Sequence, residues 1–173
     1  HHIRQYGPTL LAFRSVFRLD DDWVWDSWIA DDGELYHLFF LRAPRSLGDP
    51  GQRHTHATIG HAISSDLIDW TDLGLALAPD PRGWDDLSLW TGSVVRDTGR
   101  WLMFFTALNT ARGHGVHDQR IGVAESDDLT TWTRVLDHPA VEPDSRWYKT
   151  LRDDPTASET WRDPFVFRDP DGD

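Results

Sequence analysis

The sequence predicts an all-β protein assembled from repeated four-stranded units. Apolar residues occur in runs of four to six between Gly, Pro and Asp turn signals, and no stretch has the periodicity of an amphipathic helix. Three short elements also recur in the same order, 62 to 71 residues apart. Repetition of short strands at this spacing is typical of β-propellers, whose blades are four-stranded sheets.

The first recurring element is a short strand that begins near a Trp and ends in a turn. It occupies residues 25–33, 90–99 and 161–172, and its tryptophans lie 65 and 71 residues apart. The second element is a strand entered through a Gly turn, with the Phe pairs Phe39-Phe40 and Phe104-Phe105 separated by 65 residues. Both elements read as strands bounded by turns.

The third element repeats without a gap, because residues 59–71 are matched by residues 121–133 at an offset of 62. Each copy contains an Ile-Gly-x-Ala strand, a turn containing Asp-Leu and a Trp-Thr strand. One unit therefore holds four strands in sequence, as a propeller blade does. The alternative, a chance likeness between two β-meanders, would need three elements to recur in the same order.

The units start near residues 23, 88 and 159, so residues 1–173 are expected to form the N-terminal part of a single propeller domain. They would cover roughly the first two and a half blades, since the third unit ends just after its first strand. A propeller closes with at least about four blades. We therefore expect a C-terminal portion absent from this chain, a second chain or self-association to supply the remainder.

Charge and composition restrict the partners. The 29 Asp and Glu residues outnumber the 17 Lys and Arg residues, giving a net charge of −12. Such a surface repels nucleic acid and anionic membranes and favours a neutral ligand. The absence of Cys excludes disulfides and a Cys nucleophile. Residues 1–5 lack signal-peptide architecture, and both a secreted and a cytoplasmic location stay open.

Chemistry-bearing residues occupy the same place in successive units. Asp26, Thr91 and Asp163 each follow the Trp of the first strand by one or two positions. The innermost strands of a propeller line one central cavity, so these side chains are expected to converge. Paired carboxylates acting on a sugar ring are what glycoside hydrolysis requires. The plainer readings are a turn-capping Asp26 and a surface ion pair between Arg162 and Asp163.

Three motifs in order resemble those of the levansucrase and invertase families, which are five-bladed propeller enzymes that act on fructosyl groups. They are Val24-Trp25-Asp26-Ser27-Trp28, Leu89-Trp90-Thr91-Gly92-Ser93 and Trp161-Arg162-Asp163-Pro164. The first looks closest to levansucrases, whereas Tyr36–Phe40 and Gly60–Trp70 look more like invertases and fructanases. Related arabinan- and xylan-cleaving propellers are an alternative.

The resemblance implies a role for each carboxylate. Asp26 would be the nucleophile that forms a covalent glycosyl-enzyme, and Asp163 would stabilise the transition state. Arg162 would keep Asp163 ionised. No cofactor is implied.

The resemblance also implies a substrate subsite. Trp25 and Trp90 would form its apolar walls, although packing within the sheets is the default role of the ten tryptophans. Thr91 would hydrogen-bond near the nucleophile, where these families typically have Ser.

No residue matches the acid/base glutamate of these families, which lies in a later blade. The candidates Glu34, Glu125, Glu142 and Glu159 lack its context, so we expect it outside this chain. The predicted function is a retaining glycosidase or fructosyltransferase acting on β-fructofuranosyl substrates such as sucrose or fructan. An arabinan-type furanosidase and a non-catalytic sugar-binding propeller are the alternatives.

No metal site is predicted. The histidines fall in two sets, neither of which has a recognised ligand spacing, and they read as exposed loop residues. They are His54, His56 and His61, and His114 and His117. Residues 169–173 resemble the start of a calcium loop but are explained by a β-turn.

Overall fold

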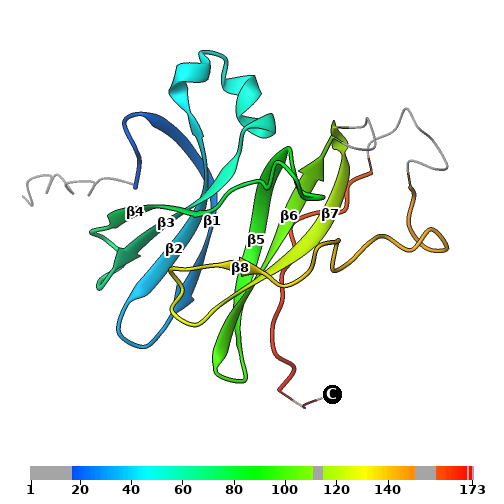
Figure 1. Ribbon diagram of the computed structural model, residues 1–173. Coiled ribbons are helices and arrows are strands. Elements are labelled where there is room, and N and C mark those ends of the chain that lie inside the picture. Colours follow the sequence, from blue (N-terminus) through cyan, green and yellow to red (C-terminus); the bar gives the residue numbers. More distant parts are fainter. Residues whose placement is uncertain (1–16, 111–114, 151–158, 171, 173) are drawn as a thin grey trace, which may run out of the picture.

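The computed structural model describes residues 17–110, 115–150, 159–170 and 172, and contains two four-stranded antiparallel sheets (Figure 1). The strands of the first sheet follow one another in chain order and are β1 (Asp22–Asp31), β2 (Tyr36–Pro44), β3 (Thr58–Ser64) and β4 (Thr71–Leu77). The second sheet repeats this order with β5 (Ser88–Asp97), β6 (Arg100–Asn109), β7 (Gly115–Ser126) and β8 (Thr133–Arg134). The predictions of an all-β protein and of a repeated four-stranded unit are confirmed.

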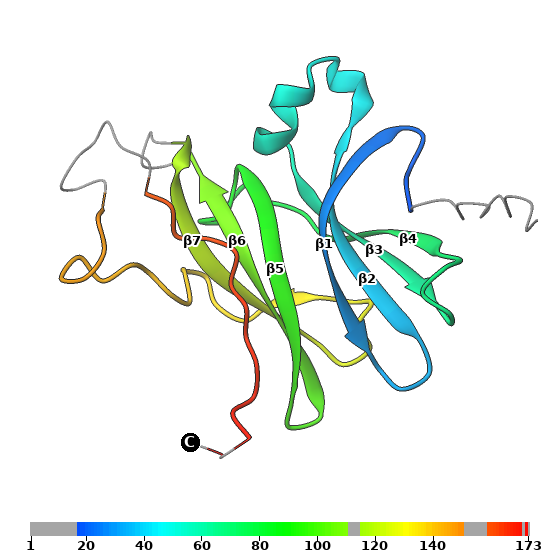
Figure 2. The ribbon, with the colours of Figure 1, turned by 180° about the vertical axis from the view of Figure 1, so that it is seen from behind.

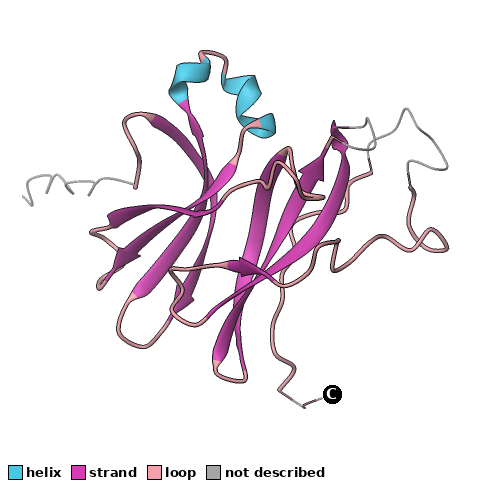
Figure 3. Ribbon diagram, viewed as in Figure 1, coloured by secondary structure: helices cyan, strands magenta, loops and turns pink. Residues whose placement is uncertain are grey.

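Two short 3₁₀ helices, η1 (Arg45–Leu47) and η2 (Pro50–Thr55), interrupt the loop between β2 and β3 (Figure 3). The strand pattern did not predict them. Asp49 begins η2, because its side chain accepts a hydrogen bond from the amide of Gly51 and Pro50 supplies the first helical position. No helix in the described part of the chain is long and apolar enough to cross a membrane.

The repeated Asp-Leu motif forms the same turn in both sheets. In the first sheet the Asp66 carboxylate accepts hydrogen bonds from two following backbone amides, and Leu67 adopts a φ of 62°. In the second sheet Asp128 does the same, and Leu129 also has a φ of 62°. The Asp side chain replaces backbone partners within the turn. Local chemistry thus explains why this motif recurs.

The paired phenylalanines face opposite sides of each sheet. Phe39 packs into the core between the two sheets, where Trp132 meets it edge to face at 5.6 Å. Phe40 lies on the other face of the first sheet, where the Phe17 ring covers it at 4.9 Å. Both phenylalanines are fully buried. The first sheet therefore packs on its two faces, as a propeller blade does.

The innermost strands β1 and β5 lie side by side (Figure 2). They carry the tryptophan motifs at matching positions, so the packing of the sheets brings the two motifs together.

The strand predicted over residues 161–169 is not formed, and this prediction is wrong. The segment instead runs alongside β5 (Figure 2). The amide of Val166 donates to the hydroxyl of Ser93 at 3.1 Å, and Arg168 pairs with Asp97 at 3.0 Å. In both complete units the first strand pairs with the second. The third unit has no second strand in this sequence, and its first segment is therefore held by side chains.

Candidate active site

Asp26 and Thr91 occupy equivalent β-bulges. The pairing of β1 with β2 shifts between Trp25 and Ser27, and that of β5 with β6 shifts between Trp90 and Gly92. The residue between each pair is therefore left out of the ladder. Asp26 has a φ of 30°, a conformation seldom adopted by residues other than Gly. Bulges re-aim side chains, and here two bulges aim them at one another.

The two bulged residues are hydrogen-bonded. The hydroxyl of Thr91 donates to the Oδ2 atom of Asp26 over 2.7 Å, which joins the first strands of the two sheets. The carboxylate of Asp26 is exposed to solvent, whereas Thr91 is half-buried. One carboxylate oxygen is therefore fixed by Thr91, and the carboxyl group remains open to a ligand.

Gly92 is required by the close approach of β5 and β6. A Cβ atom at this position would lie 2.1 Å from the carbonyl oxygen of Phe104. Its neighbour Ser93 is buried and accepts the Val166 amide, so it anchors the third segment. In the sequence Trp-Thr-Gly-Ser, Thr91 thus forms the bulge, Gly92 allows the close backbone contact, and Ser93 binds the third segment.

Thr106 connects Asp163 to the bulge of β5. Its side chain is fully buried, and its hydroxyl donates to the carbonyl oxygen of Thr91 at 3.1 Å. The same hydroxyl accepts the backbone amide of Asp163 at 2.8 Å. Motif reasoning missed Thr106. The sequence does carry a signal for it. Leu41 occupies the equivalent position of the first sheet, so the polar Thr106 stands where the repeat has an apolar residue.

Asp163 lies close enough to Asp26 for the two charges to interact. Burial raises the pKa of Asp163, the guanidinium of Arg162 lowers it, and the charge of Asp26 raises it again, leaving a pKa above the ordinary value. The Arg162 Nε atom lies 3.4 Å from the Asp163 carboxylate. Arg162 thus opposes the effect of burial without overcoming it, and its role in keeping Asp163 ionised stays a prediction.

The tryptophans Trp25 and Trp90 are both half-buried and are braced by η2. The indole Nε1 of Trp90 donates to the backbone carbonyl of His54 at 2.8 Å. The His54 ring meets both indoles edge to face, with centroids 6.3 Å from Trp25 and 6.0 Å from Trp90. The guanidinium of Arg53 lies over the Trp25 ring at 5.6 Å. A loop of the first sheet thus borders the candidate site.

Reading His61 as an exposed loop residue is wrong. His61 lies in β3 with 1% of its surface exposed, its Nε2 atom is 2.9 Å from Nδ1 of His37, and its ring stacks on Phe39. Burial and the nearby His37 lower its pKa to about 4. No group of three potential metal ligands occurs among the residues that the structure describes, and His114 lies outside them.

The glutamates serve other roles where the structure describes them. Glu34 is an exposed turn residue, and Glu125 forms an ion pair with Arg100. Glu159 is buried and forms an ion pair with Arg120, which is also buried. Glu125 and Glu159 are thus each paired with an arginine.

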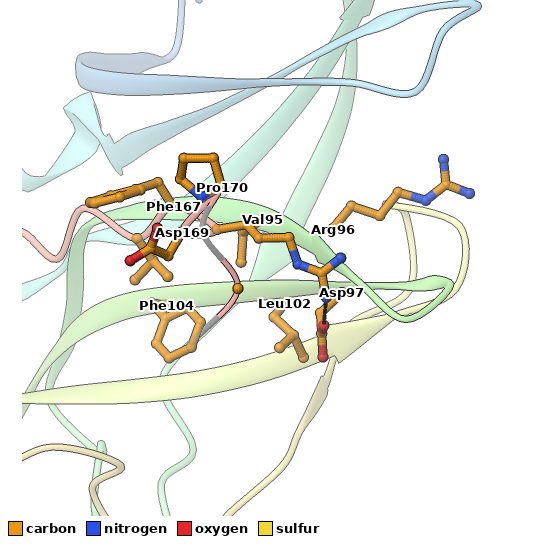
Figure 4. Close-up of a pocket in the computed structure, with 11 residues that line it drawn as sticks. Val95, Arg96, Asp97, Leu102, Phe104, Phe167, Asp169 and Pro170 are labelled. Carbon is orange, nitrogen blue, oxygen red and sulfur yellow. Dashed lines mark hydrogen bonds and ion pairs between the residues drawn. The ribbon is translucent and has the colours of Figure 1, made fainter.

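A separate groove of about 570 Å³ lies beside the third segment (Figure 4). Its lining includes Leu102, Phe104 and Phe167. Phe104 is the counterpart of Phe39, which packs against the second sheet. The groove is therefore the face on which a following blade would pack, and it does not contain the candidate site.

Fold and site together define a partial β-propeller with two neighbouring carboxylates on its inner side. The chain belongs to glycosyl hydrolases family 32, since the model of that family's N-terminal domain matches residues 27–173. The resemblance inferred from the motifs is thereby confirmed.

Relatives support the assignment. A levanase from Bacillus sp. (strain L7) is 37% identical over 152 residues, covering 80% of this chain and 14% of the levanase. The structure of inulosucrase from Halalkalicoccus jeotgali bound to kestose aligns with a TM-score of 0.71 and 28% identity, over 88% of this chain and 41% of that one.

The structure of a β-xylosidase/α-arabinofuranosidase from a compost microbial metagenome aligns with a TM-score of 0.63 and 20% identity, over 89% of this chain and 42% of that one. At this identity the likeness shows a shared fold only. The chain spans 14% to 24% of the length of the curated relatives it matches.

Proposed function

We propose that the protein is a retaining glycosidase or fructosyltransferase that acts on β-fructofuranosyl substrates, with Asp26 as its nucleophile. The observation that carries this proposal is the hydrogen bond between Thr91 and Asp26 at matching bulges, with Asp163 held next to them. Membership of family 32 and the likeness to a levanase and to a kestose-bound inulosucrase support the substrate class.

In the first step, the free oxygen of the Asp26 carboxylate attacks the anomeric carbon, and the bond to the leaving oxygen breaks. The hydroxyl of Thr91 holds the other oxygen of Asp26 and fixes the direction of attack. Water or an acceptor sugar then displaces Asp26. Because each displacement inverts the anomeric carbon, the two together retain its configuration.

Asp163 would stabilise the positive charge that develops on the ring. An ionised carboxylate can accept hydrogen bonds from two sugar hydroxyls and interact favourably with an oxocarbenium-like transition state. The hydrogen bond from its own backbone amide to Thr106 holds it in place without occupying the carboxylate. The leaving oxygen also needs a proton donor, which we propose is a glutamate outside these residues.

The test is turnover of sucrose and of levan by the full-length protein. Asp26→Asn should lower kcat by at least about 10³-fold, because it removes the nucleophile while keeping the side chain's shape. Asp127→Asn, which changes an exposed acid in a distant turn, serves as the control and should leave kcat unchanged.

Product configuration is read by NMR during early turnover. Inversion at the anomeric carbon, or full activity of Asp26→Asn, would contradict the proposed mechanism. Binding of fructosyl sugars without turnover in the full-length protein would indicate a sugar-binding propeller.

A further inference from the structure

His54 reaches the candidate site from a loop rather than from an inner strand. The loop between β2 and β3 belongs to the first sheet, yet Trp90 of the second sheet donates its indole N–H to the His54 carbonyl at 2.8 Å. This bond crosses between the two sheets and fixes the backbone of η2 beside the tryptophans. The position of His54 is thus set by its backbone and leaves its side chain free for another role.

The imidazole lies between the two indoles. Its ring makes interplanar angles of 72° with Trp25 and 70° with Trp90, so edge-to-face contacts set its orientation on both sides. The side chain is exposed, and its two ring nitrogens have no hydrogen-bond partner within the described residues. An oriented ring with unused nitrogens is therefore available to a ligand.

The charges around His54 favour its neutral form. Although the side chain is exposed, partial desolvation of the ring is the largest cause that lowers the pKa of His54; the guanidinium of Arg53 is the second, and the Asp26 carboxylate opposes them. A neutral imidazole has one N–H donor and one acceptor nitrogen, and a sugar hydroxyl likewise donates and accepts. Trp25 and Trp90 directly precede Asp26 and Thr91 in their strands, so the contacts of His54 with both indoles place its ring beside the strands that carry the site.

Arg53 adds a constraint on the adjoining wall. Its guanidinium covers one face of Trp25 at 5.6 Å, so that face is already in a cation–π contact. The sugar cannot stack on the covered face of Trp25, so a hydrogen bond from a neighbouring polar group is better placed to orient it.

We propose that His54 is a further substrate-binding residue, whose imidazole hydrogen-bonds a hydroxyl of the furanosyl ring bound at Asp26, beside Trp25 and Trp90. The inference rests on the proposed function and adds a polar contact supplied by the β2–β3 loop. The ligand class is a neutral furanoside with a free ring hydroxyl.

Two substitutions separate hydrogen bonding from aromatic spacing. His54→Phe keeps a ring between the tryptophans and removes the nitrogens, whereas His54→Gln keeps a donor and an acceptor and removes the ring. Each is made in full-length Asp26→Asn protein, which should bind sucrose without turning it over. Calorimetry gives the Kd for sucrose, and near-ultraviolet circular dichroism reports the packing of the tryptophans.

The His54→Phe variant should bind sucrose about tenfold more weakly than the Asp26→Asn parent, which corresponds to about 1.4 kcal/mol for a lost hydrogen bond. The His54→Gln variant should bind more tightly than His54→Phe, even if its dichroism changes. His138→Phe, on an exposed histidine elsewhere, is the control and should match the parent.

If His54→Phe binds sucrose as tightly as His54→Gln or more tightly, the inference is overturned. His54 would then only keep the two indole rings apart. Failure of the Asp26→Asn parent to bind any fructosyl sugar instead contradicts the proposed function, and the inference falls with it.

Discussion

The backbone amide of Asp163 donates a 2.8 Å hydrogen bond to the buried hydroxyl of Thr106 on β6. That hydroxyl in turn donates to the carbonyl of Thr91, whose side chain holds Asp26. The two carboxylates are therefore connected through two threonines, and the connection involves β1, β5, β6 and the segment that carries Asp163. The relative position of the acids depends on how β5 pairs with β6 as well as on the inner strands.

Thr106→Val should impair catalysis more than folding. The substitution keeps the volume but leaves the Asp163 amide and the Thr91 carbonyl without this partner, at a cost of about 1–3 kcal/mol. We expect a fall in kcat of about tenfold or more, measured with sucrose alongside thermal unfolding. Thr106→Ser restores the hydroxyl and should recover most of kcat. An unchanged kcat in the Val variant would show that Thr106 has no part in positioning Asp163.

Thr91→Val tests the hydrogen bond to Asp26 directly. Loss of the hydroxyl frees the carboxylate to rotate, so kcat should fall by about tenfold, an effect equivalent to one hydrogen bond, with KM nearly constant. Thr91→Ser keeps the hydroxyl and should retain activity. Steady-state kinetics of both variants checks this, and equal losses in the Ser and Val variants would point to the methyl group instead.

Replacing Arg162 should change the pH dependence of activity. In the proposed mechanism Asp163 must be ionised to stabilise a positive ring, so activity should fall as the pH drops through its raised pKa. Arg162 lowers that pKa, and Arg162→Gln should therefore shift the acidic limb of the kcat profile to higher pH. Arg162→Lys keeps the charge and should shift it less. A limb that stays in place or moves to lower pH contradicts this assignment.

The histidine pair should make stability depend on pH. The pKa of His61 is about 4 in the folded protein and about 6.5 in an unfolded chain, so the unfolded state binds more protons between these values. The stabilising effect of neutral His61 is complete above the unfolded pKa and is lost as the pH falls toward the folded one. The loss between pH 7 and pH 5 should be on the order of 2 kcal/mol.

The second sheet supplies the matched variant for this test. Leu102 and Val123 occupy the positions equivalent to His37 and His61. The double substitution His37→Leu with His61→Val should therefore flatten the dependence, as measured by urea unfolding at both pH values. If the double variant loses as much stability on acidification as the wild type, the histidines are not its source.

Gly92→Ala should unfold the second sheet's inner edge. The new Cβ would meet the Phe104 carbonyl at 2.1 Å, and backbone atoms cannot yield cheaply, so we expect a loss above about 3 kcal/mol. Gly99→Ala is the control, because its φ of 94° is unfavourable for Ala but no atom lies within 4 Å. That control should cost only about 1 kcal/mol. Similar melting temperatures for the two variants would contradict the steric argument.

The features predictable from the sequence are those encoded locally and repeated. The Gly turns and the turns centred on Leu67 and Leu129 depend on neighbouring residues, so their recurrence revealed both sheets. The repeat also predicted that Asp26 and Thr91 lie close together, because they occupy equivalent positions on the inner strands of adjacent blades. Thr106 could not be found in this way, since its role arises from pairing with β5 and its counterpart is an apolar Leu.

Neither η2 nor the position of His54 was predictable from sequence patterns. The contacts of that loop join residues of different sheets, which no local pattern encodes. The predicted third strand failed for a related reason, because the pattern of residues 161–169 is that of a strand but a strand also needs a partner. Pattern alone does not supply one.

The backbone at Asp26 and Asp163 has consequences for how the site can be altered. Their φ angles of 30° and 58° lie where Asp and Asn are tolerated better than most residues. A substitution by Ala, Glu or a β-branched residue would change chemistry and backbone strain together. Asn replacements therefore isolate the effect of charge. In a saturation library, many inactive variants at either position will be inactive because the bulge no longer forms, and protein yield must be scored beside activity.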